Sequence, residues 1–311
     1  MGSLVTVILP VFLLIGAGYV ATRFANFSQS AVDGLMKFTQ NFAFPCLLFR
    51  AVATIDLGEE FHLPLLATYY AAAFSCYVLG FAAGRFIFRR DVQDSIVIGF
   101  CCLFSNTLML GLPITERAFG VDALAPNYAI IAIHAPFCYT VGIASMEAAR
   151  ASGSGLNIFG IAAKIGRQMA RNPLVIALFL GFIVNLTDFQ VPGPLMDTIK
   201  MMVAASVPAA LFAVGGVMVQ YKIEGDLRVV LVVCLITLVV HPSLVWLFNG
   251  ASNLDTGQFR SALITAAVAP GINTYVFASI YDRAKRIAAS AVLITTAGSL
   301  FSVWFWLTIL P

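Results

Sequence analysis

SNTLMLGLPIT, residues 105–115, is the stretch of sequence that decides the fold. It places an amide, hydroxyls, Gly111 and Pro113 in the middle of an otherwise apolar segment. Proline removes a backbone donor and clashes with the carbonyl four residues earlier, so a helix built from this run should break. Lipid cannot satisfy the freed peptide groups, and such backbone survives at membrane depth only inside protein or beside water. The stretch is therefore a candidate binding site.

A second apolar stretch carries the same interruption. Val268–Phe277 reads VAPGINTYVF and contains Pro270, Gly271 and Asn273. Paired interrupted spans in the two halves of a chain are typical of the binding site of a secondary transporter.

Composition places the chain among integral membrane proteins. Hydrophobic residues make up 60% of its 311 residues and charged residues only 11%, far from the usual soluble balance. The net charge of +3 is small and unclustered, which argues against a nucleic-acid partner. The six cysteines lie in apolar runs without metal or disulfide spacing. Metalloprotease, nucleophile-elbow and P-loop motifs are absent from the sequence, so we expect neither an enzyme nor a bound cofactor.

Apolar segments near 20 residues, the length that crosses about 30 Å of hydrocarbon, divide the chain into ten predicted spans. They lie near residues 3–23, 31–55, 64–88, 93–116, 123–147, 172–188, 193–219, 227–249, 258–281 and 287–310. The sequence thus predicts an all-α, multi-pass protein of the cell (inner) membrane.

The distribution of basic residues predicts the orientation. With both termini on the outer side, most Lys and Arg fall in inner loops, and only Arg50, Arg117, Lys200 and Arg260 remain outside. The positive-inside rule favours that topology.

The chain also divides into two repeats. Residues 1–149 and 172–311 flank a predicted flexible cytoplasmic linker, 150–171. At one constant offset, Pro10 aligns with Pro173 and Gly18 with Gly181, and the run PCLLF aligns with PAALF. Five spans per repeat would insert the second repeat from the opposite face, as in many secondary carriers.

Three motifs, in this order along the chain, resemble the auxin efflux carrier family, which includes plant PIN auxin exporters and bacterial malonate and malate permeases. They are NFAFPCLLF at Asn41–Phe49, SNTLMLGLP at Ser105–Pro113 and PGINTYVFASIY at Pro270–Tyr281. The long central loop of the PIN proteins is missing, and those proteins differ at the positions of Pro270 and Asn273. The chain looks more like a prokaryotic carboxylate permease than an auxin exporter.

The resemblance implies a fold like that of bile-acid symporters and NhaA-type antiporters. In it, spans 1, 2, 6 and 7 form a scaffold, and spans 3–5 and 8–10 form a transport domain. Broken spans 4 and 9 cross as an X, which here would place Pro113 over Pro270. A homodimer through the scaffold is a further expectation.

The candidate substrate-binding residues follow from the interruptions. Asn106 and Asn273 lead, because an amide can donate to a carboxylate and can also cap a half-helix whose positive end favours an anion. The alternative is that they only satisfy broken backbone or join helices. The other candidates have either polar side chains beside the breaks or positions at the expected crossing and kinks: Ser105, Thr107, Thr274, Pro45, Gly111, Pro113, Pro270 and Gly271.

Coupling stays open. His134 lies in the centre of the fifth span and could take up a proton, although a hydrogen-bonded neutral histidine between helices is the alternative. Arg50 could pair with an anionic substrate or extend toward the headgroups. The predicted span centres carry no Asp or Glu, so H⁺ coupling, Na⁺ coupling and uniport all remain.

The function expected from these features is secondary active transport of a small organic anion, such as malonate or malate, by alternating access. The alternatives are export of an auxin-like aromatic carboxylate and a ligand-binding receptor without transport.

Overall fold

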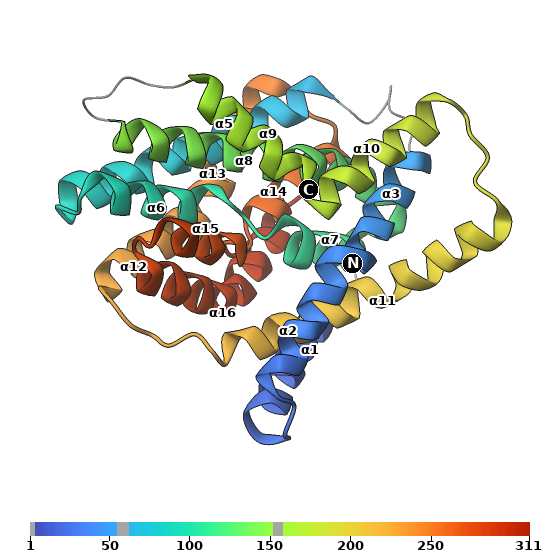
Figure 1. Ribbon diagram of the computed structural model, residues 1–311, viewed down its shortest axis with the longest axis horizontal. Helices are drawn as coiled ribbons and strands as arrows, with labels where there is room; N and C mark the ends of the chain where they lie inside the picture. The colour runs from blue at the N-terminus through green and yellow to red at the C-terminus, as the bar shows by residue number, and fades with distance from the viewer. Residues whose placement is uncertain (1–3, 55–61, 152–157) are drawn as a thin grey trace. The chain divides into compact units, whose positions relative to one another are not determined.

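The computed structural model describes residues 4–54, 62–151 and 158–311 (Figure 1). These residues are helical apart from turns and one isolated antiparallel bridge, Ser105–Pro270. They cluster into two compact units. Unit 1 comprises Met1–Ile8, His62–Ile165 and Tyr221–Pro311, and unit 2 comprises Leu9–Phe61 and Gly166–Gln220. Each unit therefore draws on both halves of the chain.

Unit 2 is built from helices near the start and the middle of the chain. They are α1 (Leu4–Phe24), α2 (Gln29–Phe38), π-helix η1 (Thr39–Ala43), α3 (Phe44–Thr54), the end of α9 (Ile158–Ala170), α10 (Pro173–Leu186) and α11 (Gly193–Met218). α1 starts within unit 1. Ser28 caps α2 by accepting from the Ala31 amide, and Asn172 caps α10 just before a favourable first-position proline.

Glycines allow the helices of unit 2 to touch backbone to backbone. A Cβ atom on Gly18 would overlap the Phe212 carbonyl oxygen of α11, and one on Gly181 would lie 2.8 Å from the Phe49 carbonyl oxygen of α3. Small residues permit such close approach in membranes, where dispersion contacts replace the hydrophobic effect.

Unit 1 holds both interrupted stretches. Its first part contains α5 (Leu63–Ala82), π-helix η2 (Ala83–Ile87), α6 (Val92–Leu103), π-helix η3 (Thr107–Gly111), α7 (Leu112–Phe119), the 3₁₀ turn η4 (Val121–Leu124) and α8 (Ala125–Arg150). Its second part contains α12 (Leu227–Leu235), π-helix η5 (Ile236–Val240), α13 (His241–Ser252), α14 (Thr256–Ala266), α15 (Asn273–Tyr281) and α16 (Lys285–Ile309).

Three helices of unit 1 begin at an aspartate N-cap. The carboxylates of Asp91, Asp226 and Asp255 accept hydrogen bonds from backbone amides in the first turns of α6, α12 and α14. An acidic N-cap satisfies an orphan donor and complements the positive end of the helix.

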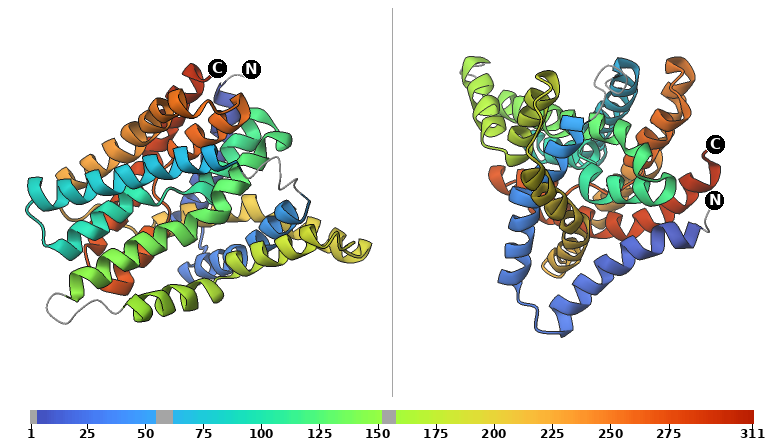
Figure 2. Two further views of the ribbon diagram at one scale, coloured as in Figure 1. Left: turned by 90° about the horizontal axis from the view of Figure 1, so that it is seen from above. Right: turned by 90° about the vertical axis from the view of Figure 1, so that its right-hand side faces the viewer.

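The start of α1 and the C-terminal end of α16 lie near one another, as both views of Figure 2 show. Arg117 of α7 donates to the carbonyl oxygens of Thr6 and Val7 at 3.1 and 3.2 Å. Arg260 of α14 donates to the carbonyl oxygen of Pro311. The C-terminal end of α7 therefore anchors the start of α1, and the first half of α14 anchors the C-terminal residue.

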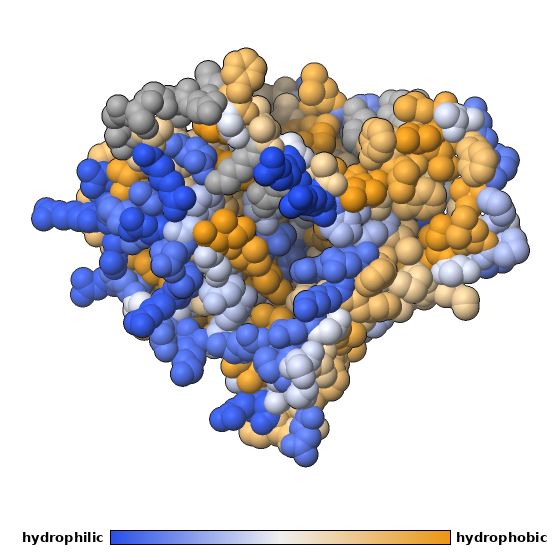
Figure 3. Space-filling view, viewed as in Figure 1, coloured by the Kyte–Doolittle hydropathy of each residue, from blue (hydrophilic) through white to orange (hydrophobic). Residues whose placement is uncertain are grey.

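Among the residues that the structure describes, six helical segments are long and apolar enough to cross a membrane by themselves. They are Thr6–Phe24, Leu63–Ile87, Val121–Arg150, Gly193–Met218, Leu227–Ser252 and Lys285–Ile309. Two shorter apolar helices are α6 and α10, and exposed apolar side chains cover much of α10 (Figure 3). Of the remaining predicted spans, 93–116 and 258–281 are each interrupted between two helices, whereas 31–55 falls on α2, η1 and α3, which follow one another without a gap. The chain is thus a multi-pass membrane protein.

The predicted linker differs from the structure. Ser152–Gly155 lie outside the described residues, but Ile158–Ala170 form α9 rather than a flexible segment. In its sequence, IFGIAAKIGRQMA, apolar and basic residues recur at helical spacing, which favours an amphipathic helix.

Candidate functional site

The two helix interruptions meet inside unit 1. α6 ends at Leu103 and α14 ends at Ala266, and the extended residues that follow each helix pair with one another. The amide of Asn106 donates to the carbonyl of Ala269 at 2.8 Å, and the amide of Gly271 donates to the carbonyl of Phe104 at 2.9 Å. We call Phe104–Asn106 with Ala269–Gly271 the crossing. It gives peptide groups that have left their helices new partners, as membrane burial requires.

The crossing does not involve Pro113, which the sequence analysis placed over Pro270. Ser105 is the residue that pairs with Pro270, and the first helix breaks well before the proline. Pro113 is instead the second residue of α7, which continues from η3 without a gap. Gly111 ends η3, and a Cβ atom there would meet Thr265 of α14 at an ordinary 3.5 Å.

Side chains satisfy further backbone groups of the crossing. The amide of Ala269 donates to Oγ of Ser299 at 2.8 Å. The carbonyl of Ser105 accepts from Nε2 of His134 at 3.0 Å. The buried hydroxyl of Thr274 donates to the carbonyl of Gly271 at 2.8 Å. Each of these side chains holds an irregular segment in place.

The two candidate asparagines stand at equivalent places but differ in contacts. Asn106 is 7% exposed and is the N-cap of η3, where its Oδ1 accepts from the amide of Met109 at 3.3 Å. This bond uses the amide oxygen and leaves the NH₂ donors for other partners. Asn273 is the first residue of α15, is half-buried and does not cap that helix. Both residues thus lie where a helix starts beside the crossing.

Ser105 is the residue on which two histidines converge. His134 of α8 meets its carbonyl, as described above, and Nδ1 of His241, the first residue of α13, lies 3.4 Å from its Oγ. The ring of Tyr69, on α5, lies 6.0 Å from the His134 ring and 5.4 Å from the His241 ring. All four side chains are buried. Thr107, the first residue of η3, is also buried and lies two residues after Ser105 in the sequence.

Two candidates lie in the other compact unit. Pro45 is the second residue of α3 and is half-buried, and Arg50 lies on the same helix, also half-buried. Both therefore belong to unit 2, whereas the crossing belongs to unit 1.

Sequence reasoning missed a second polar cluster between the broken helices. Nδ2 of Asn127, on α8, donates to the hydroxyl of Thr265 at 2.8 Å and to that of Thr115 at 3.4 Å. Thr115 donates in turn to the carbonyl of Gly111 at 3.0 Å. All three side chains are completely buried. The signal in the sequence is a lone amide, Asn127, within a long apolar run. Among the described residues, no three His, Cys, Asp or Glu side chains gather as a metal site requires.

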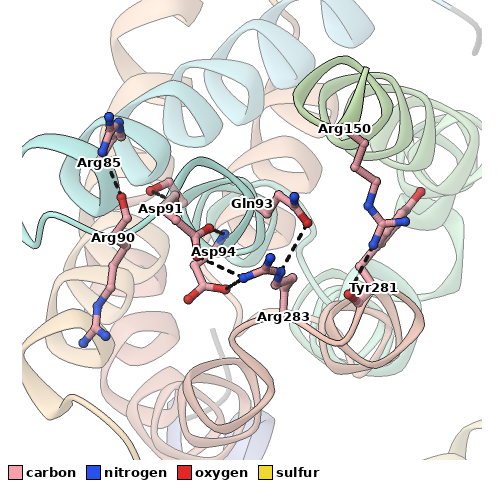
Figure 4. A network of polar contacts seen from close by, with 9 residues as sticks. Arg85, Arg90, Asp91, Gln93, Asp94, Arg150, Tyr281 and Arg283 are labelled. Atoms are coloured by element: carbon pink, nitrogen blue, oxygen red, sulfur yellow. Dashed lines mark hydrogen bonds and ion pairs between the residues drawn. The ribbon is translucent and has the colours of Figure 1, made fainter. Parts of the chain in front are cut away.

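A charged network joins the start of α6 to the end of α15 (Figure 4). Arg283 donates to Asp91 at 3.0 Å and to Gln93 at 3.2 Å. Arg150, at the end of α8, donates to the carbonyl of Tyr281 at 3.4 Å and lies over its ring. The network therefore ties together the helix ends remote from the crossing.

An adjacent pair lies outside the network. Lys285 bonds to the carboxylate of the fully exposed Asp282 at 2.6 Å. The hydrogen bond and the charge of the ammonium lower the pKa of Asp282.

The model of a family described as "Membrane transport protein" matches residues 3–307. The chain belongs to this family. With six helices in its described part able to cross a membrane, it is a multi-pass membrane transporter.

Relatives of the transporter agree with the resemblance found in its motifs. A Rhizobium meliloti protein named "Putative malonate transporter" is 27% identical, over 97% of this chain and 94% of that protein. Auxin efflux carrier component 8 of Arabidopsis thaliana is 22% identical, over 93% of this chain and 92% of that protein. A transporter of Escherichia coli strain K12, YfdV, named as uncharacterized, is 21% identical over 96% and 95%. The predicted relationship to malonate permeases and auxin carriers is confirmed.

Proposed function

We propose that this transporter carries a small organic anion, of the malonate or malate type, by alternating access. The crossing carries the proposal, because it brings two helix starts and two amide side chains to one irregular site. Helix N-termini and amide donors favour a carboxylate. The name of the Rhizobium meliloti relative supports malonate as the first substrate to test.

The proposed architecture has ten spans in two inverted repeats. Two contacts in unit 2 support the repeat. Gly18 packs on the carbonyl of Phe212, and Gly181 packs on that of Phe49. The sequence offset that relates Gly18 to Gly181 also relates Phe49 to Phe212, so the two contacts are copies of one another.

We assign the scaffold to unit 2 and the moving transport domain to unit 1. The charged network joins the broken helices at one end of unit 1, and the crossing joins them in the middle. These two connections would make the broken helices move as one body. The basic residues of Figure 4 lie at one end, whereas Arg117 and Arg260 lie with the chain termini. That grouping supports termini on the outer side. A homodimer through unit 2 remains part of the proposal.

The experiment that tests the site uses Asn106→Asp in proteoliposomes. Aspartate keeps an oxygen that can cap η3 but replaces the amide donors with a negative charge. A hydrogen bond to a charged group contributes about 1.5–3 kcal/mol, so counterflow of labelled malonate should fall at least about tenfold. Asn249→Asp is the matched control, because the Asn249 oxygen accepts from the Leu254 amide in the same manner, away from the crossing.

The same assay separates the alternatives. Equal counterflow in the Asn106 variant and the control would remove the assignment of the binding site. Saturable malonate binding without counterflow would indicate a receptor, and current without counterflow would indicate a channel. Transport of aromatic carboxylates in preference to malonate would favour an activity like that named for the Arabidopsis relative.

A further inference from the structure

His241 has a buried ring nitrogen that the crossing leaves unused. The side chain is 0% exposed, and Nδ1 faces the hydroxyl of Ser105. Nε2 has no hydrogen-bond partner among the residues that the structure describes. A buried polar atom without a partner costs free energy, so its persistence points to a ligand that arrives during function.

His134 differs from His241 although both meet Ser105. Its Nε2 faces a carbonyl oxygen, which can only accept, so this nitrogen carries the proton. Nδ1 of the same ring lies 3.9 Å from Sγ of Cys138. The Nε2–H group of His134 thus holds the carbonyl of the crossing.

The surroundings of His241 lack a counter-charge. Its titratable neighbours are Tyr69 on α5 and His134 on α8, and the elements packed around it also carry the thiols of Cys76, Cys102 and Cys234. α5 carries no charged side chain, and none of the charged side chains on α6, α8, α12, α14 and α16 is buried: Asp94, Glu147, Arg150, Arg228, Arg260, Lys285 and Arg286. An imidazolium here would be a single buried charge, which burial strongly disfavours.

An anion at the crossing would supply that missing charge. Asn106, the substrate ligand of the proposed function, directly follows the residue that His241 contacts. A carboxylate bound there would favour an imidazolium nearby, and the imidazolium would favour the carboxylate by the same factor.

We propose that His241 is the proton-binding residue of a proton–anion symporter and that its Nε2 takes up a proton when the anion occupies the crossing. This inference rests on the proposed anion transport. One proton from water entering with the anion adds to the Nε2 lone pair. The proton leaves with the anion on the other side, and no other bond changes. The bound proton lowers by one the net negative charge that crosses with the anion.

The test compares two fluxes of labelled malonate in proteoliposomes: counterflow at equal pH, and net accumulation driven by an inwardly directed gradient of one pH unit. Such a gradient can raise accumulation up to about tenfold for one proton per anion. His241→Asn keeps a polar atom near the position of Nδ1 and removes Nε2. The gain is the ratio of accumulation with the pH gradient to accumulation without it, and in His241→Asn we expect it to fall to about one. His134→Gln keeps a donor near the position of Nε2. This variant should retain the wild-type gain even if its transport rate is lower.

His62→Asn is the matched control, because His62 is exposed and precedes α5 without a side-chain cap. A wild-type gain in His241→Asn would overturn the inference and would indicate that the proton travels on the acid itself. If only His134→Gln lost the gradient-driven gain, the inference would be overturned and His134 would be the proton-binding residue.

A second measurement does not depend on any variant. With the membrane potential clamped, malonate entry into wild-type vesicles should acidify the interior in a dye assay, and entry without acidification would overturn the inference. Counterflow without a pH response would leave the proposed transport intact, whereas absence of wild-type counterflow would contradict malonate transport itself.

Discussion

The two compact units bury helix backbone in opposite ways. In unit 2, α1 and α10 remain continuous and glycines bring their surfaces onto the carbonyls of neighbouring helices. In unit 1, α6 and α14 stop, and the freed peptide groups pair with each other and with buried polar side chains. Close packing of continuous helices holds unit 2 together without polar side chains, whereas a broken helix presents polar groups to which a substrate can bind.

This difference explains why the proposed site lies in unit 1. Dispersion contacts between continuous helices leave no donors exposed. The starts of η3 and α15 instead carry partial positive charge, because the dipoles of the peptide groups align along each helix. The following predictions test the contrast, from the largest expected effect to the smallest.

The glycine contact of unit 2 should tolerate no added carbon. Gly18→Ala would force a Cβ atom into the Phe212 carbonyl, and overpacking costs about 1–3 kcal/mol or more. Thermal unfolding in detergent should show a clear loss of stability. Gly16→Ala is the control, because nothing lies within 4 Å of a Cβ atom at Gly16 on the same helix. Equal unfolding temperatures for the two variants would contradict close packing at Gly18.

The polar cluster of unit 1 should contribute more than a comparable bond in unit 2. Asn127→Ala removes two side-chain bonds between completely buried groups, at an expected cost near 1 kcal/mol, since hydrogen bonds within membranes contribute about 0.6 to 1.7 kcal/mol. Asn185→Ala in unit 2 removes a bond to the Val52 carbonyl from a part-buried site. A larger loss for Asn185→Ala in the same unfolding assay would reverse the comparison.

The charged network should contribute less to stability than the glycine contact of unit 2 or the polar cluster around Asn127. Arg283→Gln removes partly exposed ion pairs to Asp91 and Asp94, and such pairs contribute about 0–1 kcal/mol each. The loss of stability should shrink in high salt, because screening weakens exposed pairs. An effect that does not change with salt would mean that Arg283 acts through packing.

Asp282 should have the smallest effect and a defined pH dependence. Its folded pKa lies below the ordinary value because of Lys285, so the pair stabilises the fold above that ordinary pKa. The contribution is lost as the pH falls through the lowered value. Asp282→Asn should therefore differ from the wild type only slightly at neutral pH and not at all in strong acid. A difference that grows toward low pH would contradict the lowered pKa.

Local sequence chemistry predicted the existence of the interruptions but not their exact place. Pro113 suggested the first break, yet a proline in the first turn of a helix is compatible with helix formation, and the chain breaks at Phe104–Asn106 instead. Asn106 could be recognised as a cap because an amide before a polar turn has that local preference. Asn127 could not be ranked, because its partners come from two other helices.

The sequence by itself determined that this chain enters a membrane many times, that it belongs with a family of membrane transporters and that two of its apolar stretches are irregular. Those properties follow from composition, motif order and the chemistry of proline, glycine and asparagine, which act over a few neighbouring residues. Only the tertiary structure decided that Ser105 pairs with Pro270 and that His241 reaches the same serine as His134. These contacts join residues far apart in the chain, so they depend on how helices pack and on which buried polar groups find partners.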